Sequence, residues 1–421
     1  MKPKFNEDTL SEQPAIEQLK RLQYDYIHGD ELDPELRDDC ERSSRREVVF
    51  VSRLKKKLAE INPYLTDESI DKAVRRVTHI QAEGLMEANQ KFHQDLVAGI
   101  SIDQDIGARR QKQTVRFIDF EDPEKNDFLV VNQFWIRGPK ETDRPDIVIF
   151  INGIPLVVIE CKSPVAKQTG ISNAIKQLKR YQEEIPLLFH TNQICIALNL
   201  FGARYGAILA GEEFYHQWKH NGDEKFPDMA DHPTVREMLE LGLIKDKDLS
   251  NSPTAQEVLV AGILNKKNLL DIIRNFIVFE QERARTVKKV CRYQQFTAVN
   301  KILKRVTGEE DKRGIIWHWQ GSGKSLTMLF AAVKLRREEK KLKNPIILVV
   351  TDRIDLDDQI SKTFRNCNFP NPIQIREKRG GQKELYKLLG HDVGQTILAT
   401  PCIFSESRLT DLCRRLRISL F

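Results

Sequence analysis

The amino-acid sequence predicts an α/β protein of two domains, in which a mixed β-sheet flanked by helices precedes a second α/β domain. The chain has 421 residues, which is long enough for two or three domains. Short β-rich runs alternate with helical patterns between residues 114 and 200. Helices and strands resume after a polar segment near residues 245–255, where we expect the domain boundary.

The composition narrows the class of protein. Hydrophobic residues make up 40% of the chain and charged residues 30%, as in ordinary soluble proteins. The net charge of +6 is small for this length, so it permits nucleic-acid binding without demonstrating it. The seven cysteines include no C-x-x-C pair, which argues against a disulfide framework or zinc site and favours the cytoplasm. Without a signal peptide or a long apolar run, no membrane span is expected.

The expected elements follow the chain in order. Residues 1–45 are polar and predict a mobile or adapting arm. Helical periodicity from Arg46 stops at Pro63, and a second helix begins after its expected cap, Thr66. Strands are expected at 114–120, 127–138, 146–151, 154–162 and 193–200, with a helix at 171–185 and a loop at 211–234. Beyond residue 250, helices are expected at 254–265 and 268–282, and strands at 313–319, 344–352 and 395–401.

A β-hairpin carries the first group of candidate site residues. Asn152 and Gly153 lie between two apolar runs, which is the strongest short hairpin signal. A strict two-residue turn would place the carboxylates of Asp146 and Glu160 on opposite faces of this hairpin. We therefore predict a β-bulge or a longer turn that brings them to one face. Lys162 shares a face with Glu160 in any register.

Two carboxylates and an amine at one end of a hairpin suit phosphodiester hydrolysis. Asp146 and Glu160 offer the oxygen ligands that Mg²⁺ prefers, and the backbone carbonyl of Cys161 is a further candidate ligand. The metal would activate a water molecule, while Lys162 would orient that water or stabilise the transition-state charge. By itself this triplet more often marks solvated strand ends. The preceding proline, the buried strands and the charged exit together form the PD-(D/E)xK nuclease pattern.

Two residues of the following helix add to this pattern. Gln177 and Tyr181 are four positions apart and therefore share a face of the helix. In isolation, ordinary helix surface is an equally good interpretation. After a PD-(D/E)xK hairpin, Q-x-x-x-Y is a recurring companion in one branch of nucleases. Glu47 is a further acid that could approach the metal, although a helix-surface position is the more expected one.

A second group of site residues forms a phosphate-binding loop. An apolar run leads into Gly321, Ser322 and Gly323, and Lys324 and Ser325 then open a helix. Loop amides and the helix N-terminus would hold phosphate oxygens. Lys324 would reach the β- and γ-phosphates of ATP, and Ser325 would be a ligand of Mg²⁺. A chance occurrence of G-x-G-K-S is the alternative, and the flanking strand and helix patterns disfavour it.

Residues around the loop both support and limit this interpretation. His318 replaces the first glycine of the full motif, a position that helicase-like motors commonly relax. Upstream, Gln294, or else Gln295, matches the adenine-reading glutamine of superfamily 2 helicases. No D-E-x-H segment follows, and no second RecA-like lobe supplies an arginine finger. Asp352 is the alternative acid of a small nucleotide-switch ATPase, but it follows the loop too closely, so we expect almost no ATP hydrolysis.

Taken together, these residues resemble the R (HsdR) subunit of type I restriction-modification enzymes, over roughly residues 45–400. The pieces that carry the resemblance include RPDIVIFINGIPLVVIECKSP, GSGKSLTM and VVTDRIDLDDQI, in the order of that family. The resemblance implies a PD-(D/E)xK endonuclease domain at residues 1–250, followed at 251–421 by a RecA-like superfamily 2 motor lobe that is incomplete at its C-terminus. The tail at 402–421 departs from the family pattern.

The resemblance also implies an activity and partners. Asp146, Glu160 and Lys162 would be the nuclease catalytic residues, and Gln177 and Tyr181 would be linked to nuclease function. Cleavage of double-stranded DNA would require Mg²⁺, and DNA translocation would use ATP. The methyltransferase and specificity subunits of a type I complex would be partners. A nuclease fold that grips DNA or partner subunits without cutting is the alternative hypothesis.

Overall fold

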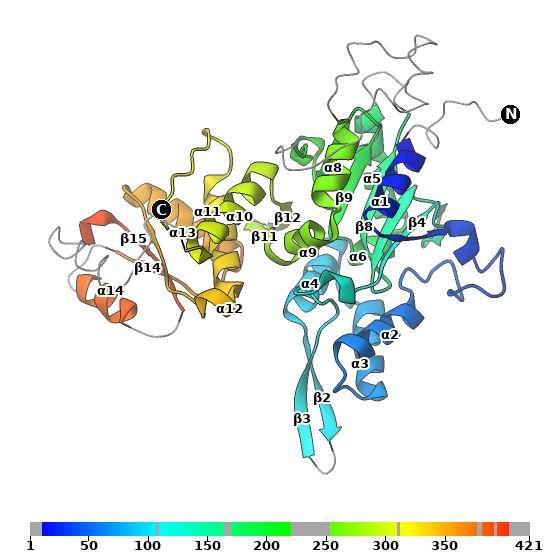
Figure 1. The fold of residues 1–421 in the computed structure, drawn as a ribbon, viewed down its shortest axis with the longest axis horizontal. Helices are drawn as coiled ribbons and strands as arrows, with labels where there is room; N and C mark the ends of the chain where they lie inside the picture. Colours follow the sequence, from blue (N-terminus) through cyan, green and yellow to red (C-terminus); the bar gives the residue numbers. More distant parts are fainter. Residues whose placement is uncertain are drawn as a thin grey trace, which may run out of the picture. The chain divides into compact units, whose positions relative to one another are not determined.

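The computed structural model describes residues 11–106, 109–163, 170–219, 253–309, 312–376, 381–390 and 394–403. The chain divides into two compact units, Met1–Arg274 and Asn275–Phe421. Both combine helices with a β-sheet, so the chain has the mixed α/β class that the sequence predicts (Figure 1). Among the described residues, no helix has the length and apolar character that crossing a membrane requires.

A six-stranded mixed sheet forms the centre of the first unit. Its strand order is β1-β4-β7-β8-β9-β10, with β1 parallel to β4, β8 parallel to β9 and the other pairs antiparallel. Every residue of β4, β7, β8 and β9 is buried, so both faces of the sheet are covered and the strands read as continuous apolar runs. The strands are β1 (Asp25–His28), β4 (Phe128–Asn132), β7 (Ile147–Ile151), β8 (Ile154–Cys161), β9 (Ile194–Leu198) and β10 (Ala203–Gly206).

Helices and two small hairpins complete this unit. The helices are α1 (Gln13–Arg21), α2 (Val51–Ile61), α3 (Asp67–Thr78), α4 (Leu85–Ala98), α5 (Gly170–Glu184), α6 (Pro186–His190), α8 (Ala255–Ile263) and α9 (Lys266–Asn275), with 3-10 turns η2 (Gly29–Leu32), η3 (Pro123–Lys125) and η4 (Glu212–Phe214). As predicted, Thr66 caps α3 by accepting a hydrogen bond from the Ser69 amide. The hairpins are β2 (Ile100–Ile106) with β3 (Arg109–Val115), which extends away from the sheet (Figure 1), and β5 (Ile136–Arg137) with β6 (Thr142–Asp143).

The prediction of a mobile or adapting arm at the N-terminus is wrong for residues 11–32, which the structure describes as regular elements. Residues 11–32 form α1, β1 and η2, and β1 pairs with β4 at the edge of the central sheet. Ile16 and Leu19 of α1 are fully buried, and the Tyr24 hydroxyl donates to the Leu264 carbonyl over 2.7 Å. The segment is ordered because its few apolar residues pack on partners that are distant in sequence.

The compact units divide later in the chain than the expected boundary near residues 245–255, most of which lies outside the described residues. The difference arises because α8 packs on α1 and β10 of the first unit. Gln256 of α8 connects this helix to the first unit by hydrogen bonds. Its Oε1 accepts hydrogen bonds from the Ser11 hydroxyl at 3.0 Å and from the Leu200 amide at 2.8 Å.

The second unit contains a three-stranded parallel sheet, of order β13-β15-β14, and an antiparallel hairpin. Its strands are β11 (Ile277–Glu282), β12 (Arg285–Val290), β13 (Ile347–Val350), β14 (Pro372–Ile375) and β15 (Thr396–Ala399). Its helices are α10 (Tyr293–Thr307), α11 (Lys324–Arg337), α12 (Glu339–Leu342), α13 (Ile354–Asn366) and α14 (Gly381–Leu389), with the 3-10 turn η7 (Pro401–Ile403).

Several expected elements differ from those observed. The apolar run 313–319 is not a strand, and Ile315 and Trp317 are 96% and 93% exposed, because no described strand pairs with it. The helix expected at 268–282 ends at Asn275 and gives way to β11. The strand expected at 114–120 ends at Val115. Most of the loop expected at 211–234 and of the tail at 402–421 lies outside the described residues.

Candidate functional site

The β7–β8 hairpin has the bulge that the sequence predicts. Asn152 and Gly153 form the turn with φ of 53° and 78°. The register shifts between Ile149 and Phe150, so that Ile147 is opposite Ile159. This shift carries Asp146, the residue before β7, to the position opposite Glu160. The prediction that a bulge corrects the register is therefore confirmed.

Asp146 is held in place by hydrogen bonds to its side chain and its backbone. Its carboxylate accepts from the Cys161 amide at 2.8 Å through Oδ2 and from the Gln133 side-chain amide at 3.2 Å through Oδ1. Its backbone carbonyl also accepts from the Gln133 amide at 2.8 Å. The side chain is buried, with the residue only 8% exposed. These contacts fix the rotamer of Asp146 at the end of the hairpin.

Glu160 and Lys162 form an ion pair beside Asp146. The Lys162 ammonium group donates to Glu160 Oε1 over 2.6 Å. Glu160 is 1% exposed, whereas the Lys162 side chain keeps 20% of its surface accessible. The Lys162 amide donates to the Leu198 carbonyl of β9, which anchors the backbone at this position. The cation compensates for the burial of the Glu160 carboxylate and still reaches solvent.

The helix α5 brings two more predicted residues to this end of the sheet. The Gln177 side-chain amide donates to the Tyr181 hydroxyl over 2.8 Å. Burial first, and then the nearby charge of Glu160, raise the pKa of Tyr181 above its usual value, so the phenol stays protonated. The negative charge of Asp146 contributes in the same direction. Helix α5 packs against β8, and Tyr181 belongs to the same buried cluster as Val158 of β8, so Tyr181 lies at the hairpin.

Two residues of this site, Glu12 and Gln133, were not predicted from the sequence. Glu12, the N-cap residue of α1, is 2% exposed and accepts from the side-chain amides of Asn132 at 2.9 Å and Gln133 at 2.8 Å. Gln133 could have been found from the sequence, because it is a polar residue directly after an apolar strand. Glu12 lies in a polar stretch, where nothing in the sequence indicates a site residue. Glu47, the acid considered from the sequence, instead accepts a hydrogen bond from the Ser43 amide at 2.8 Å.

The donor set at the end of the hairpin fits Mg²⁺. Asp146 and Glu160 are buried carboxylates opposite each other, and the Cys161 carbonyl lies between Glu160 and Lys162 in sequence. Within the described parts of the chain, no three His, Cys, Asp or Glu side chains form a metal cluster. Mg²⁺ needs no such cluster, because it is commonly held by one or two carboxylates, water and substrate phosphate oxygens.

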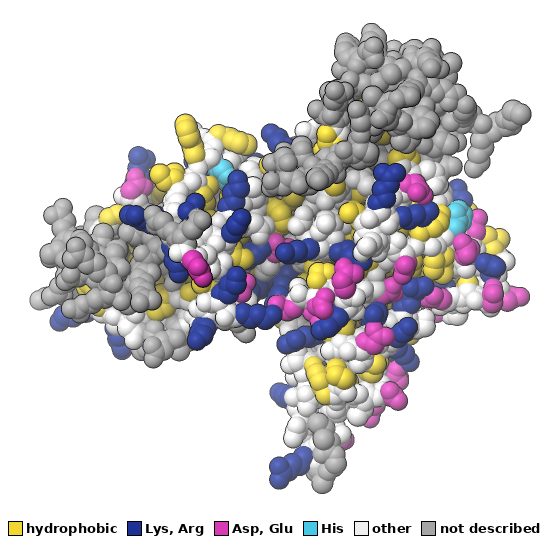
Figure 2. Space-filling model, in the orientation of Figure 1, with side chains coloured by type: hydrophobic (Ala, Val, Ile, Leu, Met, Phe, Trp, Pro, Cys, Tyr) yellow, Lys and Arg dark blue, Asp and Glu magenta, His cyan; other side chains and the backbone are white. Residues whose placement is uncertain are grey.

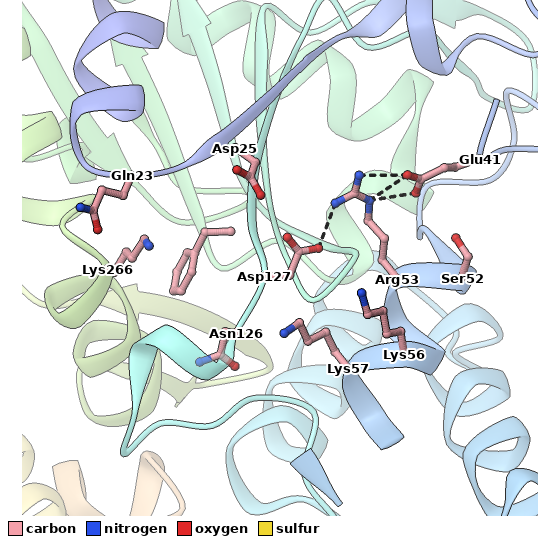
Figure 3. A pocket seen from close by; sticks show the side chains of 11 residues that line it. Gln23, Asp25, Glu41, Ser52, Arg53, Lys56, Lys57, Asn126, Asp127 and Lys266 are labelled. Carbon is pink, nitrogen blue, oxygen red and sulfur yellow. Dashed lines mark hydrogen bonds and ion pairs between the residues drawn. The ribbon is translucent and has the colours of Figure 1, made fainter. Parts of the chain in front are cut away.

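A separate hollow of about 570 Å³ lies at the other end of β4 from Gln133. Figure 3 shows Arg53 reaching both Glu41, at 2.8 Å, and Asp127, at 3.1 Å. These ion pairs tie α2 to the start of β4, so we assign the cluster a structural role. None of the predicted site residues lines the hollow, whose lining residues are Gln23, Asp25, Glu41, Ser52, Arg53, Lys56, Lys57, Asn126, Asp127, Phe128 and Lys266.

The charge on the surface is mixed. On the face drawn in Figure 2, Lys and Arg side chains of the described residues alternate with Asp and Glu side chains. This pattern agrees with a net charge of only +6. Any contact with a polyanion would therefore depend on local groups of cations rather than on the field of the whole chain.

The predicted phosphate-binding loop has the backbone that such a loop needs. Gly321 and Gly323 have φ of 80° and 85°, in the left-handed region that favours glycine. Lys324 is exposed and begins α11, followed by the half-buried Ser325, while Ser322 is buried. The loop therefore presents Lys324 and the N-terminal amides of α11 together.

The two glutamines before this loop have different surroundings. The Gln295 side chain is 2% exposed, and its amide nitrogen donates to the Gly323 carbonyl over 3.0 Å. Its Oε1 accepts from the Arg292 amide at 2.8 Å, so both ends of the amide are occupied. Gln294 instead lines a pocket of about 390 Å³ together with His318. Of the two, Gln294 is therefore the one that lines a pocket.

Comparisons with known proteins agree with this picture. Residues 4–214 match the family model "Type I restriction enzyme R protein N terminus", and residues 294–412 match "SWI2/SNF2 ATPase". A putative type I restriction enzyme MjaIXP endonuclease subunit of Methanocaldococcus jannaschii is 33% identical over 94% of the chain and 37% of its own length. The type I restriction enzyme HindI endonuclease subunit of Haemophilus influenzae is 35% identical over 94% of the chain and 36% of its own length. The chain thus spans somewhat more than a third of the length of these two relatives.

Proposed function

Because the chain belongs to the family of type I restriction enzyme R proteins, we propose that its first unit is a Mg²⁺-dependent endonuclease domain of the PD-(D/E)xK fold. One observation carries the proposal: the bulged hairpin sets Asp146 opposite Glu160, and Lys162 is paired with Glu160 at 2.6 Å. The proposed substrate is double-stranded DNA, since endonuclease subunits of type I restriction enzymes are among the relatives.

Each residue of the cluster has a role in this proposal. Asp146, Glu160 and the Cys161 carbonyl would hold Mg²⁺, which when bound polarises the phosphoryl group and lowers the pKa of a water molecule. Lys162 would orient the attacking water and stabilise the negative charge that develops on the phosphorus oxygens. Tyr181, kept protonated by burial, would donate a hydrogen bond at the site, and Gln177 would fix its hydroxyl.

For the second unit we propose an ATP-binding, RecA-like lobe of superfamily 2. The similarity to SWI2/SNF2 ATPases over residues 294–412 and the two left-handed glycines of the loop support it. Lys324 and Ser325 would contact the phosphates and Mg²⁺, and Gln294 would read the adenine. We place the end of the nuclease domain at Arg274, where the compact units divide, instead of at residue 250.

The setting of the activity is proposed from the same family membership. The chain would act in the cytoplasm as part of a type I complex, together with methyltransferase and specificity subunits. Recognition of a DNA sequence would then come from the specificity subunit, and DNA translocation would require ATP.

The proposal is tested by replacing Lys162 with alanine. We expect Mg²⁺-dependent nicking of supercoiled DNA to fall at least about a hundredfold, because transition-state stabilisation by a positioned charge is worth that much. Lys72→Ala is the matched control, since Lys72 is an exposed lysine of α3 that pairs with Glu68 along that helix. Undiminished nicking by Lys162→Ala would overturn the assignment of the site. DNA binding by the parent chain without any nicking would favour the binding-module alternative.

A further inference from the structure

Glu12 is a third buried carboxylate at the nuclease site. It belongs to α1, more than a hundred residues before the hairpin, and the roles proposed above for the hairpin residues do not use it. Its side chain is 2% exposed, and both oxygens accept hydrogen bonds from side-chain amides of residues at the end of β4. Burying a carboxylate is costly, so its position requires an explanation.

Gln133 connects Glu12 to Asp146. The same nitrogen of Gln133 donates to Glu12 Oε2 at 2.8 Å and to Asp146 Oδ1 at 3.2 Å. The two hydrogens of one amide group are thus directed at two carboxylates. The backbone of Gln133 has φ of 53°, an uncommon conformation for a residue other than glycine. The amide of Gln133 also donates to the Asp146 carbonyl over 2.8 Å, which keeps the two residues together.

The other end of Glu12 is fixed as well. Its Oε1 accepts from the Asn132 side-chain amide at 2.9 Å, and Asn132 in turn accepts from the Tyr26 hydroxyl at 2.9 Å. The helix α1 is held in place by Gln256 of α8, whose side-chain amide donates to the Ser11 carbonyl over 2.9 Å. Glu12 therefore has a defined position relative to β4 and, through Gln133, relative to Asp146.

We propose that Glu12 is a positioning residue that sets the affinity of the nuclease site for a divalent cation, acting through Gln133 on Asp146. The inference rests on the proposed nuclease function. Glu12 orients the Gln133 side-chain amide, and that amide, together with the Cys161 backbone amide, holds the carboxylate of Asp146 in one orientation. The negative charge of Glu12 adds to the electrostatic attraction for a cation at the buried site. Groups that orient metal ligands in this way commonly change metal affinity ten- to a hundredfold when they are replaced.

The test measures Mn²⁺ binding to the 421-residue chain by isothermal titration calorimetry. Glu12→Gln keeps the size of the side chain and removes its charge, and Gln133→Met removes the donors at nearly constant length. We expect each variant to raise the dissociation constant for Mn²⁺ about tenfold. The double variant should be no weaker than the weaker single variant, because both residues act through one contact. Glu17→Gln, on the exposed face of the same helix, is the matched control and should bind as the parent does.

The outcomes separate the two proposals. If Asp146→Asn abolishes Mn²⁺ binding while Glu12→Gln and Gln133→Met bind as the parent does, the nuclease site stands and the role of Glu12 is overturned. If the effects of the two single variants add in the double variant, the connection through Gln133 is overturned. If the parent shows no Asp146-dependent Mn²⁺ binding, the proposed nuclease site fails and the inference fails with it. Thermal unfolding of each variant identifies any that is misfolded, and the remaining one then decides.

Discussion

Single residues at both candidate sites are fixed by side chains from other elements. The carboxylate of Asp146 is held by Gln133, which follows β4, and by the Cys161 amide of β8. In the second unit the Gly323 carbonyl accepts from Gln295 of α10. Such cross-element contacts reduce the conformations open to a functional group before any ligand arrives, which lowers the entropy cost of binding.

Gly323 gives the sharpest prediction for a single position. A Cβ atom added there would lie 2.5 Å from Gln295 Nε2, and the φ of 85° disfavours any other residue. We expect Gly323→Ala to lower the free energy of unfolding of the second unit by about 1–3 kcal/mol, measured by urea denaturation. Gly314→Ala is the control, because no atom lies within 4 Å of an added Cβ there. Equal stability of the two variants would contradict the packing of Gln295 against the loop.

The elements that the sequence predicted well are those specified by neighbouring residues. The β7–β8 hairpin follows from Asn152, Gly153 and two apolar runs, and even its bulge could be inferred from the requirement that two carboxylates share a face. Helix α3 follows in the same way from its cap, Thr66. These signals lie in neighbouring residues, so they can be recognised without knowledge of the tertiary structure.

Elements specified by distant partners could not be predicted. The strand β1 is polar, and it is a strand because it pairs with β4 about a hundred residues later. Glu12 belongs to the site for the same reason, since its hydrogen bonds reach Asn132 and Gln133. The apolar run 313–319 is the opposite case, where a strong β pattern finds no partner among the described strands. Sequence patterns report the propensity of a segment but not its partner.

The ordering of the segment after β1 predicts a pH dependence. Burial raises the pKa of Asp33, but the hydrogen bond and the charge of Arg45 outweigh it and hold the pKa below its usual value. A carboxylate with a lowered pKa stabilises the folded state above its ordinary pKa of about 4, and the effect disappears as the pH falls through the lowered value. We expect the parent to lose more stability than Asp33→Asn between about pH 5 and pH 2. If the free energies of unfolding of the two proteins fall by the same amount over this pH range, the prediction is wrong.

At the scale of the whole molecule, the chain consists of two compact units, Met1–Arg274 and Asn275–Phe421. The first contains every residue of the proposed nuclease site, and the second contains the phosphate-binding loop. The segment from α8 to Arg274 belongs to the first unit, although its sequence lies beyond the polar stretch that suggested a boundary. Leu259, Val260, Ile263 and Leu269 of this segment are fully buried.

This division predicts the behaviour of two fragments. A fragment of residues 1–274 should unfold cooperatively in urea, because it keeps α8, which packs on α1 and β10, and all but the last residue of α9. A fragment of residues 1–250 loses seven fully buried aliphatic side chains, those of Leu259, Val260, Ile263, Leu264, Leu269, Ile272 and Ile273. The burial of each contributes about 1.5–3 kcal/mol, so together they approach or exceed the whole stability of a typical domain. It also loses Gln256, which holds Ser11 and hence α1 beside the site. We therefore expect the shorter fragment to lack both a cooperative transition and Mn²⁺ binding. If it unfolds at the same urea concentration as the longer fragment, α8 and α9 are not part of the nuclease domain.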